Sequence, residues 1–179
     1  MQLPPGGVLS KQDIEALLSQ DPPLLAAMPD ASSQIQPNGV DITLEAVSSF
    51  GGPGTIAVSN TQRVLPETGD IPFDSDGFVH LSPGAYHVRF NEVVALPHWL
   101  MAYARPRSSL LRSGVAMHTA VWDAGYSGRG ASLMVVYNPA GFRMEANARI
   151  AQLVFHTLTG ATSEGYAGAY QNEGTTSVC

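Results

Sequence analysis

The sequence predicts an all-β domain, a barrel or roll of short strands, with a short helix near its N-terminus. Four segments are apolar and β-rich or alternate apolar with polar residues as strands do, at Asp41–Leu44, Tyr86–Phe90, Leu133–Tyr137 and Ile150–Leu158. The 18 glycines and 13 prolines suit short strands joined by turns better than a helical bundle. Hydrophobic residues make up 44% of the 179 residues and charged residues 13%, so one folded domain over residues 1–179 is expected.

The helix is expected at residues 9–19, within an N-terminal helical segment 1–20. Ser10 and Asp13 have the spacing of a capping box, and one apolar stripe follows, made of Ile14, Leu17 and Leu18. The run Asp21-Pro22-Pro23 is expected to end the helix.

Two stretches are expected to lack regular structure. Residues 50–76 are rich in Gly, Pro, Ser and Asp, which predicts an excursion dominated by loops. Residues 160–179 contain Gly, Ser, Thr and Tyr with no periodicity. We expect this C-terminal arm to be mobile until something orders it.

The distribution of charge argues for a local anion site in an acidic protein. The net charge is −6, so non-specific binding to a nucleic acid backbone is not expected. Seven of the eight arginines nevertheless lie between Arg89 and Arg149. A guanidinium group grips phosphate through its planar fork. The alternative is that these arginines are scattered and solvated.

Several classes of site are excluded or disfavoured. Cys179 is the single cysteine, which excludes a disulfide framework and a multi-cysteine zinc site. The chain has neither a phosphate-binding G-x-x-x-x-G-K-[ST] loop nor a G-x-S-x-G nucleophile motif. The five histidines lack the spacing of a zinc-dependent nucleobase deaminase. No signal peptide or membrane-spanning apolar run is apparent, so a cytoplasmic protein without a membrane partner is expected.

Four segments carry most of the polar chemistry. They are Gln36–Asp41, Arg105–Arg112, Thr119–Gly128 and Ala148–Phe155. The second concentrates three arginines and two serine hydroxyls in eight residues, a set that can donate many hydrogen bonds to a polyphosphate. The third places a carboxylate, a glycine and a tyrosine within four residues, where the carboxylate could orient water and the ring could pack on a sugar.

Each segment also has an ordinary structural interpretation. The second could be a polar helix start with Ser108 or Ser109 as its cap. The third could be a turn formed by Asp123. Gln152 could be a satisfied polar residue in a core strand, and Asp41 a carboxylate at a strand end.

Taken together and in this order, the four segments resemble the dUTPase/dCTP deaminase superfamily. They are similar to its motifs Q-P-x-x-V-D, P-R-S-[GS]-L, [IVW]-D-x-[GD]-Y-x-G and R-I-A-Q-L, and the resemblance runs from about Val8 to about Gln171. It implies a distorted β-barrel of jelly-roll type (the dUTPase-like β-clip). It also implies a homotrimer with active sites shared between subunits, and Mg²⁺ on the substrate triphosphate.

Details of the resemblance favour dUTP hydrolysis on a deaminase-like scaffold, as in archaeal dUTPases. Residues 8–14 and 166–171 resemble dCTP deaminases. In those enzymes a catalytic glutamate lies three residues before the asparagine that ends the next strand. Counting back from Asn138 places Val135 there, and Ala131–Tyr137 contains no acid. Valine cannot shuttle the protons that deamination requires.

The resemblance implies a role for each candidate residue. Asp123 would hold and polarise the water that attacks the α-phosphorus of dUTP, and Tyr126 would pack on deoxyribose and exclude a 2′-hydroxyl. Asp41 is a candidate for the Mg²⁺ site, through water. The other expected substrate contacts are Ala120 and Val121 at the uracil edge, Arg107, Ser108, Ser109 and Gln152 at the phosphates, Tyr170 and Gln171 as a closing lid, and Arg105 and Arg112 as further candidates.

Two other functions stay open at this point. One is a dCTP deaminase, alone or combined with dUTPase activity. The other is a non-catalytic relative that binds dUTP. The products separate the three: dUMP with pyrophosphate, released ammonia, or none.

Overall fold

A computed structural model describes residues 6–175 of the chain; the expected arm residues 176–179, with Cys179, lie outside this range. The helices are α1 (Lys11–Leu18), α2 (Ala31–Gln34), the 3₁₀ helix η1 (Asn60–Gln62) and α3 (Ser108–Arg112). The strands are β1 (Leu25–Ala26), β2 (Ile35–Gln36), β3 (Gly39–Phe50), β4 (Thr68–Asp70), β5 (Phe78–Leu81), β6 (Gly84–Ala95), β7 (Leu100–Pro106), β8 (Val115–His118), β9 (Val121–Trp122), β10 (Ser127–Val136), β11 (Phe142–Glu145) and β12 (Arg149–Thr157).

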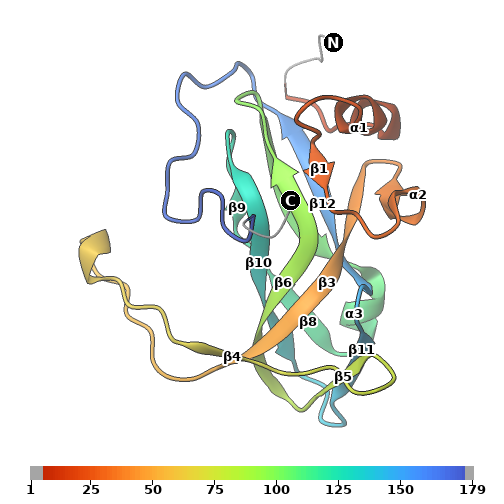
Figure 1. Cartoon of the computed structure of the whole chain (residues 1–179), viewed down its shortest axis with the longest axis vertical. Helices are drawn as coiled ribbons and strands as arrows, with labels where there is room; N and C mark the ends of the chain where they lie inside the picture. The colour runs from red at the N-terminus through yellow and green to blue at the C-terminus, as the bar shows by residue number, and fades with distance from the viewer. Residues whose placement is uncertain (1–5, 176–179) are drawn as a thin grey trace.

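Ten of these strands form one antiparallel sheet. The main path runs β8-β10-β6-β3-β12-β7-β9, and β1, β2 and β4 pair with its members at the side. The sheet curls strongly, so that β12 and β10 lie on different sides of a half-barrel (Figure 1). The prediction of an all-β barrel-like fold with a short N-terminal helix is therefore confirmed.

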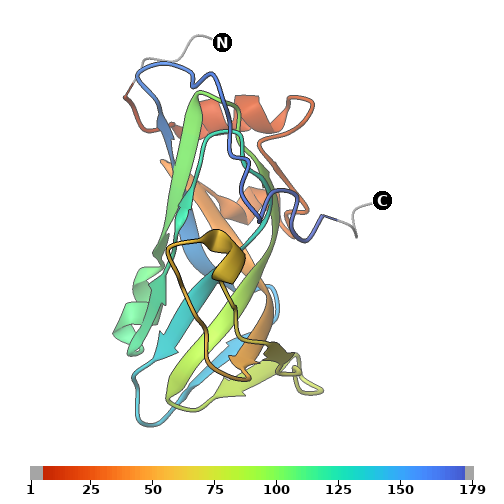
Figure 2. The same ribbon diagram turned by 90° about the vertical axis from the view of Figure 1, so that its left-hand side faces the viewer.

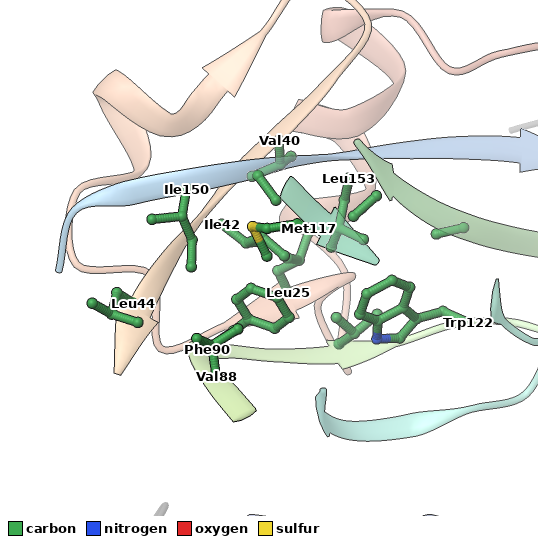
Figure 3. Close-up of a cluster of buried hydrophobic side chains, with 14 of the residues drawn as sticks. Leu25, Val40, Ile42, Leu44, Val88, Phe90, Met117, Trp122, Ile150 and Leu153 are labelled. Carbon is green, nitrogen blue, oxygen red and sulfur yellow. The ribbon is translucent and has the colours of Figure 1, made fainter. Parts of the chain in front are cut away.

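Alternation of side chains builds the core. In β6 every second residue from Val88 to Val94 is buried, including Phe90 and the charged Glu92, while the residues between them are more exposed. Figure 3 shows Phe90 with Met117 and Trp122 in the same apolar cluster. Successive side chains of a strand point to opposite faces, so each strand gives one face to this cluster.

The N-terminal helix forms as its sequence predicts. The Ser10 hydroxyl accepts a hydrogen bond from the Asp13 N–H, and the Asp13 carboxylate accepts one from the Ser10 N–H, a complete capping box. Ile14 and Leu17 are buried against the sheet. Among the described helices, none is both long and apolar enough to cross a membrane.

The residues after β8 leave the sheet on one side and join it on the other. β8 pairs with β10 from His118↔Leu133 to Val115↔Val136. The next strand, β9, pairs instead with β7, through Val121↔Tyr103 and Trp122↔Ala102. The segment from β9 to β10 is therefore a forked hairpin, because β9 and the first half of β10 are not hydrogen-bonded to each other.

The excursion between β3 and β4 projects from the body and carries η1 near its tip (Figures 1 and 2). Thr55 and Val64 join its two limbs as an isolated bridge, and both ends of the excursion are held where Phe50 pairs with Thr68. Its predicted loop character is confirmed, apart from η1 and β4.

The described part of the C-terminal arm, residues 160–175, has turns and bends but neither helix nor strand. It runs down beside β10 in both views (Figures 1 and 2). Its position shows an ordered place for the arm, while its mobility stays a prediction.

Candidate active site

A cavity of about 680 Å³ lies at the fork between β9 and β10. That volume is within the range of pockets that hold small molecules. Its wall is mostly apolar and comes from four parts of the chain: the excursion, β6, the fork and the arm. The bordering residues include Phe50, Leu65, His87, Ala120, Val121, Trp122, Asp123, Tyr126, Gly130, Ala131, Ser132, Leu133, Tyr166, Tyr170 and Glu173.

Asp123 lies exposed in the turn that joins β9 to β10, and it borders the cavity. The turn is closed by a 3.0 Å hydrogen bond from the Tyr126 N–H to the Asp123 carbonyl. Gly125 has φ +81°, and a Cβ there would lie 2.6 Å from Gly165 Cα, so this turn and the arm both require glycine. The ordinary interpretation of Asp123 as a turn residue and the functional one are therefore compatible.

Trp122 and Gly130 keep the fork open. Trp122 is 6% exposed and packs against β10 so closely that a Cβ on Gly130 would lie 2.6 Å from its Nε1. The pairing of β10 with β6 is also irregular here, with a register shift between Arg129 and Ala131. The Trp122 indole therefore occupies the space between β9 and β10, at the position where β10 is bulged against β6.

Ala120 and Val121 are exposed on the opposite limb of the fork. Since this limb does not pair with β10, it can offer its backbone groups to a planar ligand. That these two residues read a base edge stays a prediction.

Tyr126 is buried at 5% exposure and faces both the cavity and the arm. Its hydroxyl donates a 3.0 Å hydrogen bond to Glu173 Oε1, and its ring meets that of Tyr166 edge-on at 5.6 Å. Burial, followed by the Glu173 carboxylate, raises the pKa of Tyr126, so the phenol stays protonated. Burial likewise raises the pKa of Glu173, against the hydrogen bond from Tyr126.

The arm is attached to the fork chiefly through backbone groups. Gln171 accepts from the Ser127 N–H through Oε1 and donates to the Gly125 carbonyl through Nε2, each at 3.0 Å. The Arg129 N–H donates to the Glu173 carbonyl at 2.8 Å. Gln171 thus clamps the turn, whereas Tyr170 and Glu173 border the cavity.

The tip region of the excursion reaches the arm. The Arg63 guanidinium lies over the Tyr170 ring, 5.5 Å from its centroid. Such a cation–π contact is favourable even at an exposed site. The excursion and the arm therefore meet beside the cavity.

A second cluster surrounds Asp41 in β3. Asp41 is 3% exposed, and its Oδ2 lies 3.2 Å from Arg107 Nε and 3.4 Å from an Arg149 nitrogen. Burial raises the pKa of Asp41, and the two guanidinium groups oppose that shift. The carboxylate holds two cations side by side, which is a suitable arrangement for binding an anion.

The remaining predicted phosphate contacts lie around this cluster. Gln152 is paired with Asp41 on one side and with Arg105 on the other. Ser108 and Ser109 are exposed and begin α3, and Arg112 ends it. Arg107 is the N-cap residue and makes no side-chain capping bond, so the interpretation of Ser108 or Ser109 as the cap is wrong.

The structure thus separates the predicted residues into two groups. Asp123, Tyr126, Ala120, Val121 and Tyr170 border the cavity, and Gln171 lies next to it. The arginines and serines of the Asp41 cluster do not border it. In Figures 1 and 2, α3 lies away from the arm in both views. A single chain therefore does not assemble all the predicted contacts around one ligand.

Sequence reasoning missed three polar residues of these regions. Glu173 lies in a tail without periodicity, so the sequence gives no signal for it. Arg149 belongs to the R-I-A-Q-L motif, but no separate role was predicted for it. Glu92 is 1% exposed and accepts hydrogen bonds from Gln34 and Thr43. A charged residue in an alternating apolar strand is the signal that would have singled out Glu92.

Neither the position expected for the deaminase glutamate nor the β10 residue nearest to it on the cavity wall is an acid. Val135 pairs with Ala85 and Ala116 and does not border the cavity, whereas Leu133 does. Both are aliphatic, so β10 presents no acid at either position. The described carboxylates that border the cavity are Asp123 and Glu173.

Comparison with known proteins identifies the family of this chain. Residues 8–158 match the family model for dCTP deaminase-like proteins. The chain belongs to the dCTP deaminase-like family. The resemblance predicted from the four motifs is therefore confirmed.

Archaeal relatives of this chain are named probable deoxyuridine 5′-triphosphate nucleotidohydrolase. The protein of that name from Methanosarcina mazei is 48% identical over 168 residues, covering 94% of this chain and 98% of its own. The one from Archaeoglobus fulgidus is 44% identical, covering 93% and 96%. The expected likeness to archaeal dUTPases on a deaminase-like scaffold is therefore confirmed.

A solved structure supports the fold alone. The 2′-deoxycytidine 5′-triphosphate deaminase from Agrobacterium tumefaciens superposes with a TM-score of 0.63 at 24% identity. The match covers 85% of this chain and 49% of that one, so this chain spans about half of its length.

Proposed function

We propose that this chain hydrolyses dUTP to dUMP and pyrophosphate. The observation that carries the proposal is Asp123, an exposed carboxylate in the turn of a forked hairpin whose cavity is large enough to hold a nucleoside. The archaeal relatives at 44–48% identity, named as nucleotidohydrolases of deoxyuridine 5′-triphosphate, support it.

The base and sugar would occupy the cavity. A flat pyrimidine would lie between the limb at Ala120 and Val121, which does not pair with β10, and the bulged start of β10. Tyr126 would pack on deoxyribose beside it and leave no room for a 2′-hydroxyl. In this orientation the 5′-oxygen, and with it the α-phosphorus, would point toward the exposed turn.

Asp123 would then position and deprotonate the attacking water. As the water oxygen bonds to the α-phosphorus, the bond from that phosphorus to the α,β-bridging oxygen breaks, and pyrophosphate leaves. The proton of the water passes to the carboxylate. Phosphoryl transfer relies mainly on positioning and charge stabilisation, so several modest contacts are expected to contribute.

The phosphates require cations that the cavity wall does not supply. Arg107, with Ser108, Ser109 and Gln152, forms a suitable donor set, and Arg105 and Arg112 lie close in sequence. Because these residues lie away from the cavity of their own chain, we propose that they complete the cavity of a neighbouring copy. A homotrimer with shared sites satisfies this requirement.

The metal would be held mainly by the substrate. In the described residues no three His, Cys, Asp or Glu side chains are grouped as a metal cage. Asp41 Oδ2 already faces two guanidinium groups, so contact through water fits it better than direct coordination. Magnesium is commonly bound by substrate phosphates with few protein carboxylates, and when bound it would neutralise charge on the triphosphate.

The test is a product assay. The purified protein is offered dUTP, dCTP or UTP with Mg²⁺, and products are resolved by chromatography. We expect dUMP and pyrophosphate from dUTP, no ammonia from dCTP, and little turnover of UTP. Turnover of dCTP to a uracil nucleotide would favour the deaminase, and binding without any product would favour a non-catalytic relative.

Shared sites can be tested by complementation. Asp123→Asn and Arg107→Ala should each be inactive alone, yet co-expression should restore activity. With random assembly, about a quarter of sites draw an intact turn from one variant and an intact Arg107 from the other, given one donor of each kind per site. Absence of recovery in a confirmed mixed oligomer would place each site within one chain.

A further inference from the structure

Ser132 in β10 carries a hydroxyl that is buried but not hydrogen-bonded to another described residue. The residue is 7% exposed, and its Oγ has no hydrogen-bond partner within residues 6–175. Leaving a buried polar group unpaired costs free energy of folding, and most such groups in proteins are paired.

The same residue borders the cavity. Ser132 pairs with Val88 of β6 on one side. On the other side, the pairing of β10 with β8 begins at the next residue, Leu133. Ser132 therefore lies at the point where the two limbs of the fork separate. The Ser132 Oγ is itself buried in the ligand-free structure, so contact with a ligand in the cavity would require a rotation about the Cα–Cβ bond.

The surroundings of this hydroxyl make it chemically distinct. Trp122, Ala131 and Leu133 also border the cavity, and all three are apolar. Sites for small molecules typically combine an apolar wall with a few placed polar groups that set orientation. A serine hydroxyl both donates and accepts, so it can pair with a ring carbonyl or with a ring N–H.

We infer that Ser132 is a specificity-determining residue, whose hydroxyl hydrogen-bonds the polar edge of the pyrimidine base that enters the fork. The inference rests on the proposed function. The unbound protein bears the cost of an unpaired hydroxyl, and the bound base supplies its partner. Such a group opposes ligands that cannot pair with it, because binding them leaves it buried and unsatisfied.

This role predicts opposite effects of one substitution on stability and on binding. Ser132→Ala should raise the melting temperature of the ligand-free protein, since it removes an unpaired buried group. It should weaken the binding of α,β-imido-dUTP, measured by calorimetry, by roughly three- to tenfold, the usual worth of one hydrogen bond. Binding of tripolyphosphate, which has no base, should not change.

A matched control is Ser48→Ala. Ser48 is also buried in the sheet, but its hydroxyl donates to Asp70 Oδ1 at 2.6 Å. Its loss should lower the melting temperature and leave α,β-imido-dUTP binding unchanged. The pair of variants separates a hydroxyl that waits for a ligand from one that serves the fold.

Three results would overturn the inference. They are unchanged affinity of Ser132→Ala for α,β-imido-dUTP, an equal loss for tripolyphosphate, or a fall in melting temperature. The proposed function has its own readout, because it fails only if the parent protein does not convert dUTP to dUMP. An active parent with an unaffected Ser132→Ala variant would reject the role of Ser132 alone.

Discussion

The hydroxyl of Tyr126 donates a 3.0 Å hydrogen bond to the carboxylate of Glu173, 47 residues further along the chain. This contact joins the turn that carries Asp123 to the C-terminal arm. A ring expected to pack on the sugar is thus held by the segment expected to close over the nucleotide. The order of the arm and the orientation of Tyr126 are therefore coupled.

Docking of the arm should weaken as the pH rises. Burial raises the pKa of Glu173 above its ordinary value of 4.5, so the docked arm binds a proton more tightly than a solvated arm does. Docking is therefore most favourable below that ordinary value and loses stability as the pH rises through the raised one. Backbone ¹⁵N relaxation at Gly168 and Gly174 should report greater mobility at pH 8 than at pH 5.

Glu173→Gln is the control for this pH dependence. The amide oxygen can still accept from Tyr126, but the side chain no longer titrates. Arm mobility in this variant should be the same at both pH values. A pH effect that persists in Glu173→Gln would assign it to another group.

Tyr126→Ala should relax discrimination between dUTP and UTP. Without the ring, the space beside the sugar can accept a 2′-hydroxyl, so the ratio of the kcat/KM values for dUTP and UTP should fall. Tyr126→Phe keeps the ring and loses only the bond to Glu173, so it should keep the ratio. An unchanged ratio in Tyr126→Ala would leave the residue a purely structural part of the turn.

Asp123→Asn should lower turnover by about 10²–10⁴-fold, the usual contribution of a general base. The amide keeps the size of the side chain but cannot accept the proton of the attacking water. Because Asp123 is exposed in a turn, the melting temperature and oligomer size of the variant should match those of the parent. Turnover close to that of the parent would move the role of base to another carboxylate, with Asp41 the next candidate.

Asp41→Asn should separate stability from activity. Burial raises the pKa of Asp41 despite its two arginines, so its ionised form costs the folded state stability above that pKa. The variant should therefore gain melting temperature relative to the parent as the pH rises from about 4 to 8. Its KM for dUTP should increase, because Arg107 and Arg149 are no longer held together. A difference in melting temperature between variant and parent that does not grow from pH 4 to pH 8 would contradict this account.

Local patterns in the sequence determined the elements and the chemistry. Alternation in Tyr86–Phe90 predicts a strand with one buried face, and the Ser10–Asp13 spacing predicts the helix start, because both depend on residues close in the chain. The residue types of the four motifs likewise indicate a phosphate-binding cluster and a carboxylate–tyrosine turn. These conclusions need no knowledge of which segments meet.

Tertiary structure alone decided how these parts are arranged. The unpaired fork depends on Trp122 lying against Gly130, and the division between the cavity and the Asp41 cluster depends on the order of strands in the sheet. The bond from Tyr126 to Glu173, like the unpaired hydroxyl of Ser132, depends on packing between segments distant in sequence. Periodicity reports which face of a strand is buried but not what it is buried against, so such long-range relationships appear only once the chain is folded.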